Sequence, residues 1–123
     1  MAHGIFAIEL LRSAEMIIGP QQNVKAIPFL AEEGAEILTE KIKIALASFQ
    51  DQEVLVITDL KGGTPCNVSF VLMHQRKFTL LVGLNLPLLL EALISKDLDE
   101  SASLMGDRLV DIGRTSIEKI TAY

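Results

Sequence analysis

Two kinds of apolar pattern alternate along the chain, one with helical spacing and one of short unbroken runs. Residues 32–49 place their apolar side chains on one broad helical face, with Glu40, Lys41 and Lys43 elsewhere. Residues 54–57 are all apolar, which is typical of a strand covered on both faces. These patterns predict helices over residues 5–18, 32–49, 65–74, 87–94 and 101–112, and strands over residues 24–29, 53–58, 78–82 and 116–123.

The alternation of helices and buried strands predicts the fold class. It favours an α/β domain with a doubly wound, mainly parallel sheet flanked by helices on both faces. We expect one domain over residues 1–123, because two halves would each be too small to bury a good core. A domain of this class should begin with a strand, yet the helical pattern starts at Ile5. The first strand is therefore expected to be missing or truncated.

Composition narrows the class of protein. Half of the 123 residues are hydrophobic and 22% are charged, which excludes a disordered chain. The net charge of −5 argues against nucleic-acid binding, because that needs cations to replace phosphate counterions. The longest apolar runs stop well short of a membrane span, and the start lacks the pattern of a signal peptide. The single cysteine, Cys66, excludes an internal disulfide framework, so we expect a cytoplasmic protein.

Candidate chemistry lies where strands end and helices begin. In open parallel sheets, ligands bind beyond the C-terminal ends of the strands, which singles out Asp59 and residues 83–85. His3 and Gly4 come just before the first predicted helix, whose free N–H groups favour an anion. A neutral imidazole there can attack phosphorus through one ring nitrogen, while Asp59 accepts a hydrogen bond from the other.

A second helix start adds candidate phosphate ligands. Gly62, Gly63 and Thr64 precede the predicted helix 65–74, so their backbone N–H groups and the hydroxyl can cradle phosphate oxygens. The same sequence is also typical of a plain tight turn, and it is not a Walker loop. Two histidines and one cysteine provide no metal-ligand spacing, so we expect no metal and no cofactor. The second histidine, His74, is expected to be solvated.

Three segments carry motifs that can be compared with a known family. Residues 3–19 begin with His-Gly-Ile-Phe-Ala, residues 58–67 read Thr-Asp-Leu-Lys-Gly-Gly-Thr-Pro-Cys-Asn, and residues 83–87 read Gly-Leu-Asn-Leu-Pro. In this order and spacing they resemble the IIA domains of the mannose family of bacterial sugar phosphotransferase systems. The resemblance covers essentially the whole chain. It departs from the family at the start, because family members carry a strand of several residues before the histidine.

The resemblance implies a role for each candidate residue. His3 would accept a phosphoryl group from the histidine-containing phosphocarrier protein, with Asp59 as its orienting hydrogen-bond partner. Thr64 takes the place of a hydroxyl residue that contacts the phosphate, while Gly62 and Gly63 let the loop approach closely. The phosphoryl group would then pass to a IIB component, and the sugar would be phosphorylated later with the membrane components IIC and IID.

The resemblance also implies how the protein meets its partners. Two proteins must dock in turn on a shallow site, so apolar side chains are expected beside His3, with Ile5, Phe6 and Leu60 as candidates. A homodimer is implied as well, in which the predicted strand 116–123 crosses to the sheet of the partner subunit.

Two other functions stay open. A phosphotransferase subunit of dihydroxyacetone kinase shares the fold and an N-terminal histidine, although the Gly-Gly-Thr-Pro motif favours the sugar-transport branch. A non-transport regulatory phospho-acceptor domain, for example a receiver-like module phosphorylated on Asp59, would need an acidic pair where Ala2 and His3 stand. No residue indicates which sugar is involved, or whether the chain was part of a IIA–IIB fusion.

Overall fold

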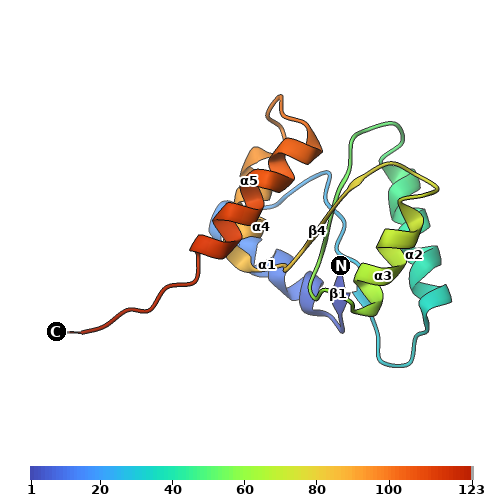
Figure 1. Cartoon of the computed structure of the whole chain (residues 1–123), viewed down its shortest axis with the longest axis horizontal. Helices are drawn as coiled ribbons and strands as arrows, with labels where there is room; N and C mark the ends of the chain where they lie inside the picture. Colours follow the sequence, from blue (N-terminus) through green and yellow to red (C-terminus); the bar gives the residue numbers. More distant parts are fainter. Residues whose placement is uncertain (123) are drawn as a thin grey trace.

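A layer of strands separates two groups of helices in the computed structural model, which describes residues 1–122 (Figure 1). Within these residues the elements are, in chain order, β1 (Ala2–His3), α1 (Phe6–Ile18), β2 (Pro28–Phe29), α2 (Ala35–Ser48), β3 (Leu55–Thr58), α3 (Thr64–Leu72), β4 (Thr79–Val82), α4 (Leu86–Ser95) and α5 (Ala102–Thr115). Helices α2 and α3 lie on one side of the strands, and α1, α4 and α5 lie on the other (Figure 1). The predicted α/β class with parallel strands is confirmed.

The apolar residues 55–57 of strand β3 alternate between two covered faces, as is typical of a strand between two helix layers. Val56 belongs to the core cluster that contains Leu38 and Ile42 of α2. Leu55 and Ile57 pack instead against the cluster formed by α4, α5 and β4. Strand β3 is therefore packed against helices on both faces. This packing fixes the position of Asp59, the residue that follows the strand.

Backbone hydrogen bonds set the order of the strands. β1 pairs with β2, and β3 pairs with β4, both in parallel. The ammonium group of Met1 donates to the Ile57 carbonyl at 2.7 Å, and the His3 N–H donates to the Asp59 carboxylate at 3.0 Å. His3 comes two residues after Met1, and Asp59 comes two residues after Ile57. The segment of β1 therefore runs parallel beside β3. The strands thus form two two-stranded parallel sheets, β1–β2 and β3–β4, which lie side by side with their C-terminal ends along one edge.

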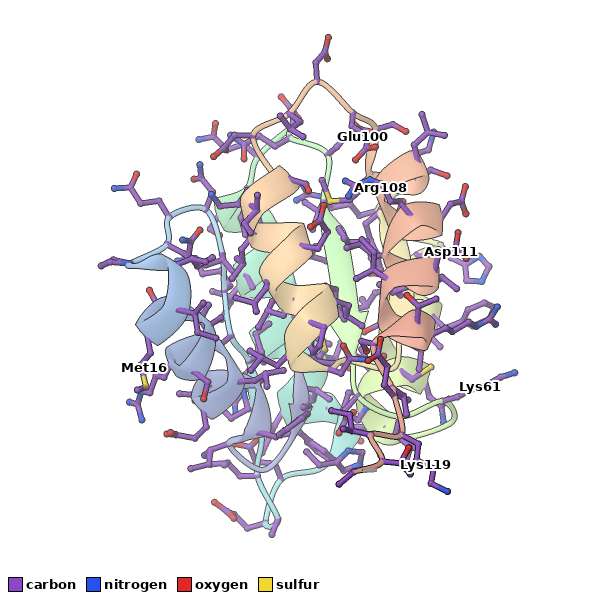
Figure 2. All side chains as sticks on the ribbon, turned by 90° about the vertical axis from the view of Figure 1, so that its left-hand side faces the viewer. Met16, Lys61, Glu100, Arg108, Asp111 and Lys119 are labelled. Atoms are coloured by element: carbon purple, nitrogen blue, oxygen red, sulfur yellow. The ribbon has the colours of Figure 1, made fainter. Side chains whose placement is uncertain are left out.

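Helices α4 and α5 form a closely packed pair. Arg108 of α5 donates to Glu91 of α4 at 2.6 Å and to Glu100 in the connecting loop at 2.7 Å (Figure 2). Further along α5, a Cβ on Gly113 would lie only 3.2 Å from a methyl carbon of Leu88. The sequence pattern predicted that this helix ends before Gly113, which is wrong, because the glycine serves close packing and the helix continues to Thr115.

Two predicted strands are shorter or absent. Of residues 24–29, only Pro28 and Phe29 pair as a strand, because β1 offers only two residues to pair with. Residues 116–122 form no strand, and Tyr123 lies outside the described residues. Ile117 and Ile120 are 82% and 90% exposed on a tail that runs away from the body (Figure 1). No helix within residues 1–122 is both long and apolar enough to cross a membrane.

The short β1 leaves space inside the sheet layer. Two adjoining cavities of about 370 and 120 Å³ lie along β3. Both are lined by Val24 on the β2 side and by Leu55 and Ile57 of β3, and the smaller one reaches Met1. The cavities therefore continue the line of β1 backwards between its two neighbours.

We expect a short apolar strand fused ahead of Met1 to stabilise the fold. A Val-Ile-Val-Ile extension would continue β1 between β2 and β3 and bury side chains in the cavities, which should raise the free energy of unfolding by about 2 kcal/mol or more. Urea unfolding of the chain with and without the extension measures this difference. A Gly-Ser-Gly-Ser extension of equal length is the control, and equal stability of the two extended chains would contradict the prediction.

Candidate functional site

His3 is the last residue of β1 and lies at the edge where the strands end. Gly4 follows with a φ of +60°, a conformation that glycine adopts without strain, and its N–H donates to the Phe29 carbonyl at 2.7 Å. This turn ends the strand and lets α1 begin at Phe6. The His3 side chain is 47% exposed, so its ring is open to another molecule.

Asp59 holds both the backbone and the ring of His3. One carboxylate oxygen, Oδ2, lies 2.8 Å from His3 Nδ1 and 3.0 Å from the His3 backbone nitrogen. The other oxygen accepts a hydrogen bond from the Leu60 N–H at 3.0 Å. An ionised carboxylate can only accept, so Nδ1 carries the proton and, in the neutral ring, Nε2 keeps a free lone pair. The predicted pairing of His3 with Asp59 is thus present in the structure.

The electrostatics keep Asp59 ionised. Partial burial raises the pKa of its carboxyl, but the hydrogen bonds from the His3 ring and backbone outweigh this effect. The pKa of Asp59 is therefore held below its ordinary value of 3.8. The carboxylate is charged at neutral pH and offsets positive charge that develops on the imidazole.

The loop after Asp59 is a tight turn that lies against the imidazole. The Gly63 N–H donates to the Leu60 carbonyl at 3.1 Å, and Gly62 has a φ of +80°, as at the third position of a type II turn. A Cβ on Gly63 would lie only 2.8 Å from Cε1 of His3 and 3.5 Å from Nε2. Only glycine lets the backbone come this close to the ring.

The start of α3, next to Gly63, is a candidate anion-binding feature. Gly63 is its N-cap residue and provides no side-chain cap, while the first hydrogen bond to the Gly63 carbonyl comes from Asn67. The N–H groups of Thr64 and Cys66 therefore have no partner within residues 1–122, and neither does the hydroxyl of the half-buried Thr64. Such groups beside His3 Nε2 can stabilise the oxygens of a bound anion.

The structure thus brings the predicted site residues together, and it adds Phe29. Its ring meets the His3 ring edge-on, with centroids 5.7 Å apart and planes at 67°. The sequence indicates Phe29 only as the last residue of the predicted strand 24–29, and its contact with His3 follows from the pairing of β2 with β1. Lys61, in the same loop as the glycines, extends away from the body into solvent (Figure 2).

Other candidates have structural roles or lie elsewhere. Asn85 caps α4 by accepting from the Leu88 N–H at 3.0 Å and also contacts the Gly113 carbonyl at 3.5 Å, so residues 83–85 connect the sheet to α4 and α5. His74 lies beyond the end of α3, where its ring meets that of Phe70. Within residues 1–122, no group of three or more acidic, histidine or cysteine side chains is placed to hold a metal ion.

Comparisons with known proteins identify a family and similar proteins. Residues 1–107 match the family model EIIA-man, described as "PTS system fructose IIA component". The mannose-specific EIIAB component of Escherichia coli K12 is 35% identical over 98% of this chain, which spans only 38% of that protein. The fructose-specific EIIA component of Bacillus subtilis is 37% identical, covering 96% of this chain and 86% of the relative.

Solved structures show the same fold. The mannose/sorbose-specific IIA subunit from Enterococcus faecalis superposes with a TM-score of 0.92 at 31% identity, over 100% of this chain and 92% of that one. A phosphotransferase system EIIA component from Streptococcus agalactiae gives a TM-score of 0.89 at 34% identity, over 96% and 92% of the two chains.

Acid should weaken the Asp59–His3 contact only below the ordinary range of an aspartate. The pKa of Asp59 is lowered in the folded state, so its contribution is complete above about 3.8 and is lost as pH falls through the lower folded value. We expect the wild type to exceed Asp59→Asn in free energy of unfolding down to about pH 5, with the margin shrinking below about pH 3.8.

Urea unfolding of both proteins across this pH range measures the margin, and Asp51→Asn, at an exposed position, provides the background. A margin already absent near neutral pH, or one unchanged in strong acid, would show that the carboxylate is not stabilised as described.

Proposed function

This chain belongs to the EIIA-man family of sugar-specific phosphotransferase system IIA components, and from that premise we propose that it carries a phosphoryl group on His3. IIA components act as the phosphotransferase parts of these systems. The observation that carries the proposal is the His3 ring itself, which is bound at Nδ1 by Asp59 and exposed beside the uncapped start of α3. The donor we propose is the histidine-containing phosphocarrier protein, and the acceptor is a IIB component.

The transfer needs only side chains of the two proteins. The lone pair on His3 Nε2 attacks phosphorus on the phosphohistidine of the donor. A new nitrogen–phosphorus bond forms as the donor's bond breaks, and its electron pair returns to the donor imidazole. The proton on Nδ1 of His3 stays in its hydrogen bond to Asp59, which offsets the positive charge of the phosphorylated ring. No nucleotide, metal or cofactor takes part.

The start of α3 supplies the oxygen contacts in this proposal. The N–H groups at residues 64 and 66 and the Thr64 hydroxyl steady the phosphoryl oxygens, and the turn from Gly4 into α1 adds a second helix start beside His3. Gly62 and Gly63 allow the loop to approach the ring closely enough for these contacts.

Docking of the donor and then the acceptor needs an exposed surface around His3. Ile5, Phe6 and Leu60, the residues proposed for docking, are 54%, 43% and 61% exposed and flank His3 and Asp59 in the chain. Both complexes are transient, because the phosphoryl group must leave soon after it arrives. We place these exchanges in the cytoplasm, with the sugar phosphorylated later through the membrane components IIC and IID. The relatives are named for mannose, fructose and sorbose, which leaves the sugar open.

The exposed C-terminal tail supports a homodimer. Strand β4 pairs with β3 on one side and with no strand of residues 1–122 on the other. Ile117 and Ile120 are almost fully exposed in a single subunit. We propose that the tail pairs with the sheet of the partner subunit, where the unpaired edge of β4 would accept it.

Replacing His3 tests the carrier function. We expect the wild type to gain a phosphoryl mass when incubated with phosphoenolpyruvate, the first enzyme of the system and the phosphocarrier protein. His3→Ala should gain none, because it lacks the nucleophile. Intact-protein mass spectrometry before and after mild acid measures this, since phosphohistidine is acid-labile.

His74→Ala is the matched control, because it removes the other histidine and should be labelled like the wild type. Labelling of His3→Ala, or no labelling of the wild type, would count against the carrier function. Transfer from labelled protein to a kinase subunit, but not to a IIB component, would favour the dihydroxyacetone kinase alternative.

Removal of the tail tests the homodimer. We expect the full chain to sediment as a dimer and a variant lacking residues 117–123 to sediment as a monomer, because the strand that joins the subunits is gone. Ile44→Asp, on the outer face of α2, removes an apolar side chain that is 72% exposed and should leave the dimer intact. A full chain that stays monomeric at all concentrations refutes the proposal.

A further inference from the structure

Asn67, near the start of α3, forms a hydrogen bond back to the glycine turn. Its side-chain Nδ2 donates to the Gly62 carbonyl at 3.0 Å. At the other end of the same peptide unit, the Gly63 N–H donates to the Leu60 carbonyl at 3.1 Å. The peptide between Gly62 and Gly63 is therefore held by a hydrogen bond at each end.

This peptide ends at Gly63, the residue of the loop that faces the imidazole. Gly63 approaches His3 so closely that a Cβ would lie 2.8 Å from Cε1. Two glycines in a row have the widest backbone freedom, so their own side chains offer no resistance to rotation of the peptide between them. Rotation would move Gly63 relative to the ring and shift the start of α3, which begins at the next residue.

The amide at this position has a property that a carboxylate lacks. The first turn of a helix favours acidic side chains, because the helix dipole is positive there. Unlike an ionised carboxylate, however, an amide can donate to the Gly62 carbonyl, and it adds no negative charge next to an incoming phosphoryl group. Asn67 meets both requirements at once.

We infer that Asn67 is a positioning residue for phosphoryl transfer to His3, acting through the Gly62–Gly63 peptide. The inference rests on the proposed function and adds a part to its machinery. Asn67 touches no reacting atom. It keeps Gly63 and the free N–H groups at the start of α3 in place against the ring, so its loss reduces the rate of transfer while leaving the docking surface unchanged.

Two substitutions separate this role from a structural one. Asn67→Asp keeps the shape, removes the donor and suits the helix start, so its melting temperature should stay at or above that of the wild type. Asn67→Leu removes the donor without adding charge. We expect both variants to lower kcat for phosphorylation by the phosphocarrier protein about 10-fold, with KM unchanged.

The matched control is Gln75→Leu. Gln75 lines the same groove between α2 and α3 as Asn67 and makes no contact with the glycine turn, so its loss should leave kcat unchanged. A second readout is independent of transfer. The amide resonance of Gly63 in a ¹H–¹⁵N spectrum should shift or broaden in both Asn67 variants and stay in place in Gln75→Leu.

The outcomes distinguish this inference from the carrier function. Wild-type rates in the Asn67 variants, or a loss of rate that follows a loss of melting temperature, overturn the inference and leave the carrier function intact. If the wild type itself takes no label, the carrier function fails, and the Gly63 resonance still decides whether Asn67 holds the peptide. An unchanged resonance in Asn67→Leu overturns that role.

Discussion

The contact between His3 and Asp59 depends on how β1 lies beside the end of β3. Asp59 Oδ2 accepts hydrogen bonds from the ring and from the backbone N–H of the same histidine. Together with the hydrogen bond from Met1 to the Ile57 carbonyl, the bond from the His3 backbone joins β1 to the end of β3, so one carboxylate both links the two pairs of strands and orients the imidazole. A shift of register by one residue would turn the His3 side chain to the other face and separate the pair. The position of the His3 ring therefore depends on the arrangement of the strands.

Most of the site could be predicted because its residues adjoin the ends of apolar runs. Asp59 follows the buried strand β3 directly, and the glycine turn with Thr64 follows Asp59 in the chain, so local order alone places them at one edge. Phe29 and Asn67 were not assigned a role, because their roles depend on contacts that spacing does not encode. Phe29 contacts His3 through the pairing of β1 with β2, and Asn67 donates a hydrogen bond back to the Gly62 carbonyl just before its own helix.

The fold was predictable to the same extent and for a related reason. Helical spacing of apolar residues indicates helices, and unbroken apolar runs indicate buried strands. The length of a strand, however, depends on the neighbouring strand available for pairing. Residues 24–27 have no long partner strand, and residues 116–122 have none within the described chain, so both remain outside the sheet. Gly113 shows the other weakness of local signals. A glycine near a helix end can stop the helix or allow close packing, and here contact with Leu88 decides for packing.

A carrier also needs a balance between orientation and exposure. A buried histidine would be well oriented but closed to partner proteins, and a free one would be open but unoriented. The His3 side chain is about half exposed and forms one hydrogen bond at Nδ1 to Asp59. The lowered pKa of Asp59 keeps this carboxylate charged throughout the neutral pH range. In the proposed mechanism the carboxylate stabilises the phosphorylated ring without touching the phosphoryl group, and the N–H groups at the start of α3 contact its oxygens. The exposed part of the His3 ring would then leave phosphorus open to a second protein, which onward transfer requires.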